Sequence, residues 1–355
     1  MVTQKPRLAI LDDYQGVAAA KLEHLSYAIG IETFTDHLDS HDLDQRRKLI
    51  NRLKPFTIIS TMRERTAFPS GILEMLPHLK LLLTTGMKNA NIDLATCTKR
   101  GIVVAGAKGI GRAPLLDQPT SLHSTLEHTW ALILGLCRNI ARDDAVLNGG
   151  DGWETSLATG LRGKTLGILG LGKLGVDTAR VGALAFGMNV QAWSSNLTQE
   201  KADEAARTAP LPEGTFRVAK SKEELLRAAD VISVHYVLSE RSRGLLGASE
   251  LAFLKPSAVL VNTSRGPLVD EISLQHVLKE GKIRGAALDV FDREPLPSDS
   301  EWRTAKWGRQ HGRGEVILSP HMGYAEEGVV HRWYEDTAQT LEDWLAGKPL
   351  VTQPN

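Results

Sequence analysis

Short apolar runs alternate with amphipathic segments along the first hundred residues. The apolar runs, typical of buried strands, are Leu8–Leu11, Ile31–Thr35, Phe56–Ser60, Leu79–Thr84 and Ile102–Ala105. The segments with apolar residues at helical spacing are Val17–Leu25, Leu43–Leu53 and Ile92–Lys99. Because parallel strands need helical crossovers, this alternation predicts a parallel sheet covered by helices.

The pattern changes after the fifth apolar run. Ala107–Ser121 is rich in glycine and proline, and we expect a loop or linker there. Leu122–Leu147 then places apolar residues at helical spacing, which predicts one long helix that leads into a second domain.

The strand and helix alternation resumes at Lys164. We expect strands at Thr165–Leu169, Asn189–Trp193, Val231–His235, Ala258–Asn262, Gly285–Val290 and Val316–Leu318. We expect helices at Lys173–Ala185, Glu223–Ala228, Ala248–Phe253 and Ile272–Lys279. The polar stretch Ser298–Gly314 should be a surface loop, and Glu326–Ala346 a helix that packs back on the first domain.

Bulk composition narrows the class of protein. A chain of 355 residues is long for a single hydrophobic core, so two domains are expected. Lysine plus arginine and aspartate plus glutamate both number 42, and this balance gives no electrostatic footprint for nucleic acid or membrane. Since no leader-like start and no long apolar run occurs, we expect no membrane span and a cytoplasmic location. Cys97 and Cys137 should be buried free thiols, and no metal site is expected.

A glycine-rich turn follows the strand predicted at Thr165–Leu169. The segment Gly170-Leu171-Gly172-Lys173-Leu174-Gly175 fits the pattern G-x-G-x-x-G, and a helical segment and a further strand come after it. The first glycine permits a tight bend, the second lets the backbone approach a pyrophosphate, and the third lets the helix lie close to the sheet. Free amides at the start of the helix would bind the phosphates, so the turn predicts a dinucleotide site.

The acidic residue that usually binds the ribose of the dinucleotide is missing. Its position falls near Ser194, which Ser195 and Asn196 follow. No carboxylate repels a 2′-phosphate there, and these side chains could donate hydrogen bonds to one. The cofactor is therefore NADP(H) or NAD(H), and we expect NADP(H).

Arg265, Glu294 and His321 each come shortly after a predicted strand of the second half. An imidazole can donate a proton to a ketone oxygen as hydride arrives, and a carboxylate beside it favours its protonated form. A guanidinium can bind a substrate carboxylate in a fork and polarise the adjacent carbonyl. Each residue alone could be structural, but downstream of a dinucleotide turn the trio indicates a redox enzyme for an anionic carbonyl substrate.

Six stretches of the sequence together resemble a known family. They are LLLTTGMKNANIDL, STLEHTWALILGLCR, LRGKTLGILGLGKLG, LKPSAVLVNTSRGPLVD, GAALDVFDREPLP and SPHMGY. The chain resembles the D-isomer-specific 2-hydroxyacid dehydrogenases, in particular those similar to glyoxylate and hydroxypyruvate reductases. The resemblance implies an α/β fold of two Rossmann-like domains. A doubly wound parallel-sheet dinucleotide-binding domain, residues 122–322, would be inserted in a smaller flavodoxin-like substrate domain, residues 1–121 plus 323–355.

The resemblance also implies roles for individual residues in the reversible reduction of a 2-oxo acid to the D (R)-2-hydroxy acid. His321 would be the general acid or base, Glu294 would tune it, and Arg265 would bind the substrate carboxyl and carbonyl. Backbone amides of Gly86 and Met87 would also hold the carboxylate. Positions expected to line the cofactor are Lys173, Leu174, Val237, Ser242, Thr263, Asp289 and Gly323, with Asp289 at the nicotinamide amide. A homodimer is implied, with the Leu122–Leu147 helix and the loop after it at the interface.

Some features depart from the family pattern or leave alternatives open. Tyr236 stands where relatives commonly have a proline, and the loops at Ala107–Ser121 and Ser298–Gly314 are longer than usual. Arg63 follows a strand end and is a substrate contact, a helix-capping residue or a surface charge. A cofactor-sensing corepressor would keep the same fold and trio, and so would a degenerate cofactor-binding scaffold. Formate dehydrogenase is disfavoured, because an amide stands there in the place of Glu294.

Overall fold

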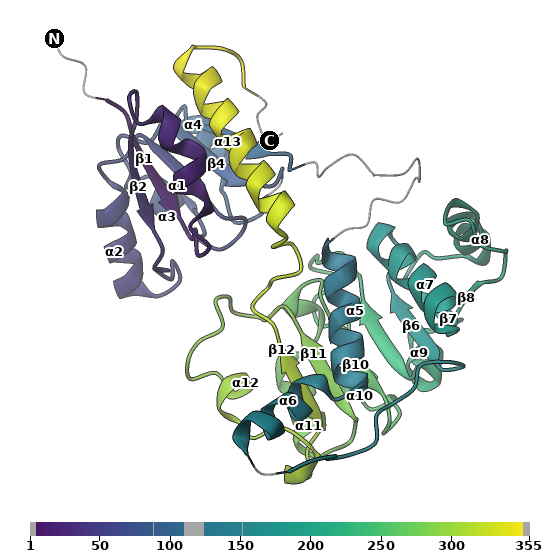
Figure 1. The fold of residues 1–355 in the computed structure, drawn as a ribbon. Helices are drawn as coiled ribbons and strands as arrows, with labels where there is room; N and C mark the ends of the chain where they lie inside the picture. Colours follow the sequence, from purple (N-terminus) through teal and green to yellow (C-terminus); the bar gives the residue numbers. More distant parts are fainter. Residues whose placement is uncertain (1–4, 88, 110–123, 151, 351–355) are drawn as a thin grey trace. The chain divides into compact units, whose positions relative to one another are not determined.

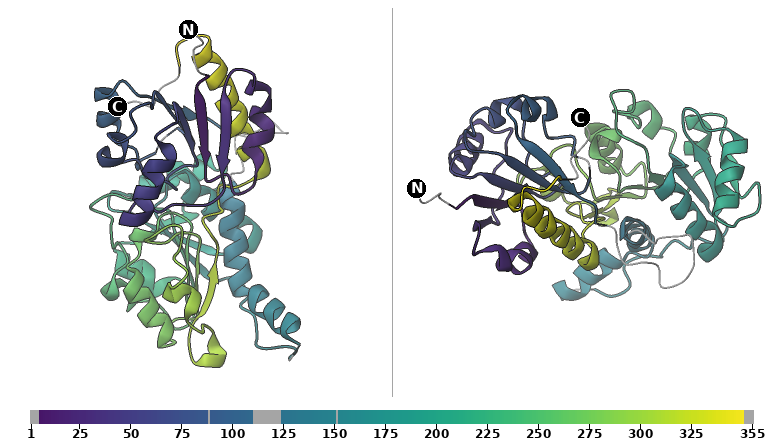
Figure 2. Two further views of the ribbon diagram at one scale, coloured as in Figure 1. Left: turned by 90° about the vertical axis from the view of Figure 1, so that its left-hand side faces the viewer. Right: turned by 90° about the horizontal axis from the view of Figure 1, so that it is seen from above.

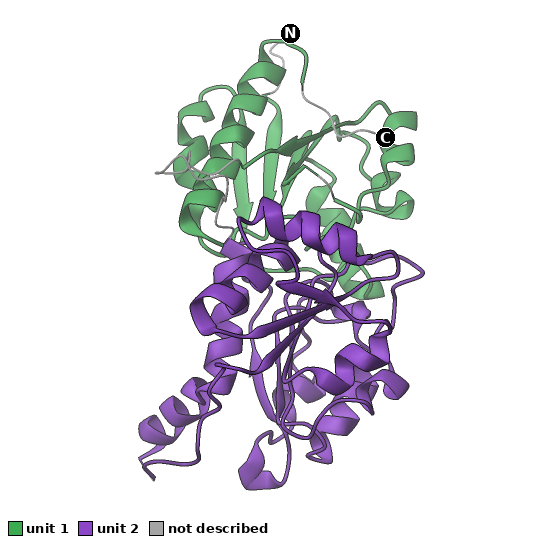
Figure 3. Cartoon of the chain, turned by 90° about the vertical axis from the view of Figure 1, so that its right-hand side faces the viewer, with its two compact units in different colours: residues 1–115, 325–355 green, residues 116–324 purple. Residues whose placement is uncertain are grey.

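The computed structural model describes residues 5–87, 89–109, 124–150 and 152–350 and divides the chain into two compact units (Figures 1 and 3). Unit 1 is Met1–Leu115 with Ala325–Asn355, and unit 2 is Leu116–Tyr324. The boundary expected at 121/122 lies outside the described residues, and the one expected at 322/323 lies just before Ala325.

Unit 1 is built on a parallel sheet with the strand order β2-β1-β3-β4-β5. The strands are β1 (Arg7–Leu11), β2 (Gly30–Phe34), β3 (Ile58–Thr61), β4 (Leu81–Thr85) and β5 (Val103–Ala107). The helices are α1 (Val17–Leu22), α2 (Leu43–Leu53), α3 (Ser70–Leu73), α4 (Leu94–Lys99) and α13 (Glu327–Leu345). β3 and β4 are buried along their whole length, as continuous apolar runs in a parallel sheet require. The order is flavodoxin-like, with its reversal between β1 and β3.

The C-terminal helix α13 completes the unit in which the chain begins. It packs against α1, β4 and β5 (Figure 1) and buries Trp333, Tyr334 and Leu341. An ion pair of 2.7 Å joins Lys21 on α1 to Glu335 on α13. The amphipathic tail therefore supplies one of the helices that cover this sheet.

Unit 2 contains a longer parallel sheet in the order β12-β11-β10-β9-β6-β7-β8. Its strands are β6 (Thr165–Leu169), β7 (Asn189–Trp193), β8 (Phe216–Val218), β9 (Val231–Val234), β10 (Val259–Asn262), β11 (Gly285–Leu288) and β12 (Glu315–Leu318). Its helices include α7 (Lys173–Phe186), α8 (Gln199–Thr208), α9 (Lys222–Ala228), α10 (Ala248–Leu251), α11 (Glu271–Lys279) and α12 (Glu301–Thr304). The order reverses between β6 and β9, the point at which doubly wound sheets bind ligands. These sheets confirm the predicted fold class.

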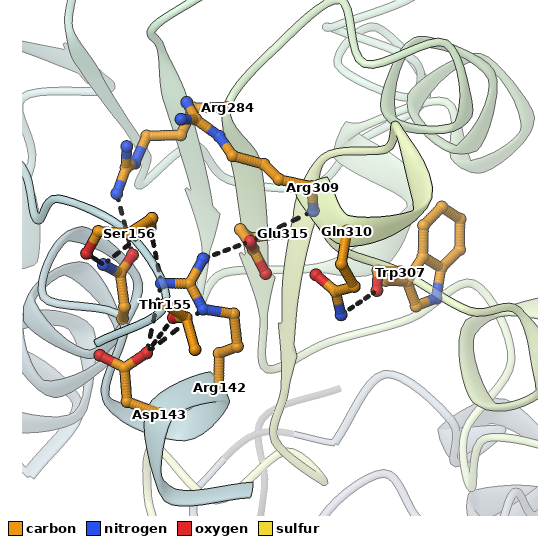
Figure 4. Close-up of polar contacts among 10 residues, drawn as sticks. Arg142, Asp143, Thr155, Ser156, Arg284, Trp307, Arg309, Gln310 and Glu315 are labelled. Atoms are coloured by element: carbon orange, nitrogen blue, oxygen red, sulfur yellow. Dashed lines mark hydrogen bonds and ion pairs between the residues drawn. The ribbon is translucent and has the colours of Figure 1, made fainter. Parts of the chain in front are cut away.

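The prediction of one continuous helix over Leu122–Leu147 was wrong. α5 (Ser124–Cys137) ends before Asn139, whose backbone is left-handed with φ 61°, and α6 (Ile140–Gly149) follows. Asn139 is buried, and its side-chain oxygen accepts a hydrogen bond of 2.9 Å from Arg284. Figure 4 shows the adjacent ion pair in which Arg142 of α6 lies 2.8 Å from Glu315 on β12. Partners distant in the sequence therefore fix this break.

All residues of α6 are exposed or half-buried, and the helix projects from the rest of unit 2 (Figure 2). The Thr155 hydroxyl donates a hydrogen bond to Asp143, and the Arg142 guanidinium donates one to Ser156 Oγ, so polar contacts connect α6 to the segment that follows (Figure 4). α6 is therefore held by polar contacts instead of a hydrophobic face.

The segment Ser298–Gly314 is not simply a polar surface loop, as expected from its composition. It forms α12 and a 3₁₀ turn at Arg309–His311, and Trp302 is only 2% exposed. The Trp302 and Trp307 rings lie 5.5 Å apart between centroids. The apolar area of these aromatic rings outweighs the polar character of their neighbours and anchors the segment on the core.

Cys97 and Cys137 are buried free thiols, as predicted, and burial raises the pKa of each to about 11. Within the described ranges, no helix combines the length and the apolar character needed to cross a membrane.

Candidate active site

The glycine-rich turn joins β6 to α7 as the sequence predicts. Gly170 has φ 95°, a conformation that disfavours other residues, and a Cβ atom there would lie 2.7 Å from the His235 carbonyl oxygen. A Cβ atom on Gly175 would lie 2.1 Å from the carbonyl oxygen of Gly170, so the helix packs closely on the turn. Among the described residues, no heavy atom lies within 4 Å of the Cβ position of Gly172, the N-cap of α7. The backbone amides of Lys173 and Leu174, at the start of α7, therefore lie beside open space. A pyrophosphate could enter this space and accept hydrogen bonds from them.

The residues expected at the ribose end of the cofactor lie on the turn after β7. Ser194 is half-buried, and Ser195 and Asn196 are exposed. The Tyr236 hydroxyl accepts a hydrogen bond of 3.1 Å from the Ser195 amide and donates one of 3.0 Å to its Oγ. The Lys201 ammonium donates to the Asn196 carbonyl at 3.0 Å. The sequence interpretation missed Lys201, a cation on α8 whose ammonium group lies beside this turn.

The loop after β10 carries Arg265. The Asn262 side chain holds it, because its amide donates to the Arg265 carbonyl at 2.9 Å and its oxygen accepts from the Ser264 amide at 3.0 Å. A Cβ atom on Gly266 would lie 2.1 Å from the carbonyl carbon of Phe291. Only glycine therefore lets this loop pack directly on the loop after β11, where Glu294 is found.

Glu294 and His321 form an ion pair between the loops after β11 and β12. Glu294 Oε2 lies 2.5 Å from His321 Nδ1, and Oε1 accepts a hydrogen bond of 2.9 Å from the Phe291 amide. The side chains are 21% and 16% exposed, so water has limited access to the pair. His321 has φ 55°, a left-handed conformation that costs a non-glycine residue about 1–3 kcal/mol. The surrounding structure must hold it there.

Asp289 lies beneath the His321 loop and is 1% exposed. Its carboxylate accepts hydrogen bonds of 2.7 and 2.9 Å from the amides of Met322 and Gly323, and lies 3.1 Å from His128 Nε2. Burial opposes ionisation of Asp289, but hydrogen bonds from His128, Ser319 and these amides outweigh it and lower the pKa. Asp289 thus holds backbone atoms, a contact that motif reasoning did not find.

The other residues expected to line the cofactor differ in their surroundings. Val237 is 81% exposed, whereas Ser242 is buried and its hydroxyl donates to the Val237 carbonyl at 2.7 Å. Thr263 is 8% exposed, and its Oγ1 lies 2.8 Å from Oγ1 of Thr129 on α5. Ser242 and Thr263 shape the loops at the carboxyl edge of the sheet.

In unit 1, Arg63 and Gly86 follow the adjacent strands β3 and β4. Gly86 has φ 88°, and Nη1 of Arg63 lies 3.0 Å from its Cβ position. The Arg63 amide donates to Thr85 Oγ1 at 3.0 Å, and its guanidinium carbon lies 5.7 Å from the Trp333 ring centroid. Met87 follows Gly86 and is half-buried. A fixed cation therefore lies beside the Gly86 backbone.

No group of three or more histidine, cysteine, aspartate or glutamate side chains that could hold a metal ion occurs in the part of the chain that the structure describes.

Comparisons with known proteins agree with this geometry. Residues 130–323 match the model of the NAD binding domain of D-isomer specific 2-hydroxyacid dehydrogenases. Glyoxylate reductase of Aeropyrum pernix is 33% identical over 308 residues, which cover 82% of this chain and 83% of that protein. D-3-phosphoglycerate dehydrogenase of Methanocaldococcus jannaschii is 32% identical, and the match covers 87% of this chain but 54% of that longer protein.

A solved structure shows the same fold along nearly the whole chain. It is the phosphoglycerate oxidoreductase of Vibrio cholerae, with a TM-score of 0.80 and 30% identity over 96% of this chain and 99% of that one. The shared fold, the dinucleotide turn and the extent of these matches lead to one conclusion: the chain belongs to the D-isomer specific 2-hydroxyacid dehydrogenases.

Proposed function

We propose that this D-2-hydroxyacid dehydrogenase reversibly reduces a small 2-oxo acid to the D (R)-2-hydroxy acid, with His321 as general acid and base. The observation that carries the proposal is the 2.5 Å pair of Glu294 and His321. The pair follows strands of the same parallel sheet that forms the dinucleotide turn. Such an imidazole–carboxylate pair suits proton transfer at a carbonyl oxygen.

The proposed roles follow from the hydrogen bond between Glu294 and His321. Glu294 uses Nδ1 of His321, so Nε2 would donate the proton to the substrate carbonyl oxygen, and the carboxylate would stabilise the imidazolium. The bound nicotinamide dinucleotide supplies the hydride. Arg265 would bind the substrate carboxylate and polarise the carbonyl. In the reverse direction, neutral His321 would accept the proton from the alcohol.

The substrate proposed is glyoxylate, hydroxypyruvate or a larger 2-oxo acid. Backbone amides of Gly86 and Met87 would bind its carboxylate, and Arg63 beside Gly86 adds a positive charge to that loop. Relatives named glyoxylate reductase support the small acids.

We favour NADP(H) as the cofactor. Ser194, Ser195 and Asn196 place no negative charge on the turn after β7, and Lys201 adds an ammonium at the Asn196 carbonyl. This combination suits the extra phosphate of NADP(H) better than the free ribose hydroxyl of NAD(H).

A homodimer formed through α6 and the segment after it is also proposed. Large apolar side chains are exposed there, at Ile140, Leu147, Trp153 and Leu157, and the last is 90% exposed. A second copy of the chain would cover them. Light scattering after size exclusion should show a dimer that Trp153→Asp with Leu157→Asp converts to monomer, while Leu184→Asp on α7 leaves it intact. A monomeric wild type would contradict the dimer.

The first test is absorbance at 340 nm with NADPH and NADH in separate assays. The panel is glyoxylate, hydroxypyruvate, pyruvate, phenylpyruvate and larger branched 2-oxo acids. Cofactor oxidation with any of these acids, lost in His321→Ala, supports the proposal. Tight cofactor binding without turnover across the panel would instead favour the cofactor-sensing corepressor, and this proposal would fail.

A further inference from the structure

One face of α5 contacts the loop that carries His321 and the loop that carries Arg265. Thr125 Oγ1 donates to the Gly323 carbonyl at 3.0 Å, and Thr129 Oγ1 lies 2.8 Å from Oγ1 of Thr263, two residues before Arg265. His128 lies between them on this face, as residues three and four apart on a helix do. Its Nε2 is 3.1 Å from Asp289 Oδ1 and 2.9 Å from Ser319 Oγ.

The contacts of His128 lead to backbone atoms on both sides of His321 in the sequence. On the earlier side His128 contacts Ser319, whose carbonyl accepts the His321 amide at 3.0 Å. On the later side it contacts Asp289, whose carboxylate accepts the Met322 and Gly323 amides. The left-handed φ of 55° at His321 lies between these two anchors. Strained residues keep such a conformation only where neighbouring contacts define it.

We propose that His128 is a positioning residue that, through Asp289 and Ser319, holds the backbone around His321 and so keeps its ring paired with Glu294. The inference rests on the proposed role of His321 in proton transfer. His128 itself touches neither the reacting atoms nor the cofactor in this scheme. It stabilises a buried carboxylate by donating a hydrogen bond, and that carboxylate fixes two successive amides.

The same contacts give Asp289 a role in addition to the one expected for it. Its oxygens already accept two backbone amides and lie within hydrogen-bond distance of His128, and the residue is 1% exposed. A contact with the nicotinamide amide would come in addition to this network. Asp289 therefore also sets the path of the chain after His321.

The test compares two replacements of His128. Gln keeps a neutral donor near the Nε2 position, whereas Leu keeps bulk and removes the donor. His128→Leu should lower kcat about 10–100-fold, because a small misplacement of a proton donor is costly, while the KM for cofactor changes little. The pH–rate profile of kcat should also shift, since the Glu294–His321 pair is disturbed. His128→Gln should restore most of both. His276→Gln is the matched control, because His276 makes an exposed 3.4 Å pair with Glu280 in the same unit.

The outcomes separate this inference from the function on which it rests. If His321→Ala is as active as wild type, the proposed function fails. If His321→Ala is inactive but His128→Leu keeps the wild-type kcat and pH profile, only the positioning role is overturned. An equal loss in the Leu and Gln variants, with a raised cofactor KM, would also overturn it. If the Leu variant does not fold, His128→Asn, too short to reach Asp289, replaces it with the same expectation.

Discussion

The hydroxyl of Tyr236 closes a small ring of hydrogen bonds with Ser195, accepting from its amide at 3.1 Å and donating to its Oγ at 3.0 Å. Tyr236 occupies the position at which a proline was expected, and its ring stacks with Trp193 at a centroid distance of 6.2 Å. The departure from the family pattern therefore has a structural consequence. It fixes the turn that would meet the ribose end of the cofactor.

Ser194→Asp should lower the ratio of kcat/KM for NADPH over NADH by at least about fivefold. A carboxylate on this turn would repel a 2′-phosphate, and a like-charge contact costs about 1 kcal/mol or more. Lys201→Ala should weaken NADPH use without affecting NADH, and Lys279→Ala on α11 is the control. If the ratio of kcat/KM for NADPH over NADH is unchanged in both Ser194→Asp and Lys201→Ala, the ribose of the cofactor does not bind at this turn.

Glu294→Gln should move the pH dependence of both directions of the reaction. Reduction needs protonated His321, so its kcat is high at low pH and falls as pH rises. Without the carboxylate the imidazolium is less stable, so the fall in the rate of reduction should move to lower pH. Oxidation needs neutral His321, so its rise should also move to lower pH. Glu294→Gln pH profiles that coincide with those of wild type would show that the Glu294–His321 pair does not control proton transfer.

His321→Ala should lower kcat about 10²–10⁴-fold, because the group that transfers the proton is lost.

Arg265→Lys should raise the KM for the 2-oxo acid and lower kcat. Lysine keeps the charge but loses the two parallel N–H groups that bind a carboxylate in a fork. The control is Arg227→Lys, an exposed arginine on α9 that pairs with Glu223 at 2.9 Å. Steady-state kinetics with the best acid of the panel measure the effect. Wild-type values in Arg265→Lys would remove the residue from the substrate site.

The sequence predicts the elements whose causes are local. β6, β7 and α2 have the bounds expected from their apolar spacing, and Asp42 caps α2 through the amides of Asp44 and Gln45. The dinucleotide turn is equally local, because its glycines are required by contacts within a short stretch of chain. Periodicity is a sufficient guide wherever the determining neighbours are close in sequence.

Features determined by distant partners could not be predicted. The break at Asn139 depends on Arg284, and Trp302 is buried because of a core to which distant strands contribute. The contact of His128 with Asp289 joins residues 161 positions apart. In the sequence, His128 is one of several polar residues at the start of a largely apolar helix, and only the assembled sheet brings it under the His321 loop.

His235 provides a test of stability that does not depend on the reaction. Burial lowers its pKa from 6.5 to about 4, and its ring nitrogen lies 2.9 Å from Ser233 Oγ. Between these pH values the unfolded chain binds a proton that the folded chain excludes, so the free energy of unfolding falls as pH drops from 6.5 toward 4. The full shift corresponds to about 3 kcal/mol. Because the residue keeps partial exposure, this value is an upper bound.

Urea unfolding of wild type and His235→Asn at several pH values between 7.5 and 4.5 measures this contribution. Asparagine has no proton to gain, so the variant should lose less stability than wild type over this range. The difference between the two proteins should shrink as pH falls. His311→Gln, an exposed histidine of the same unit, should follow wild type throughout. Parallel curves for wild type and His235→Asn would mean that His235 is solvated when protonated. In that case its burial would not contribute to the acid sensitivity of the fold.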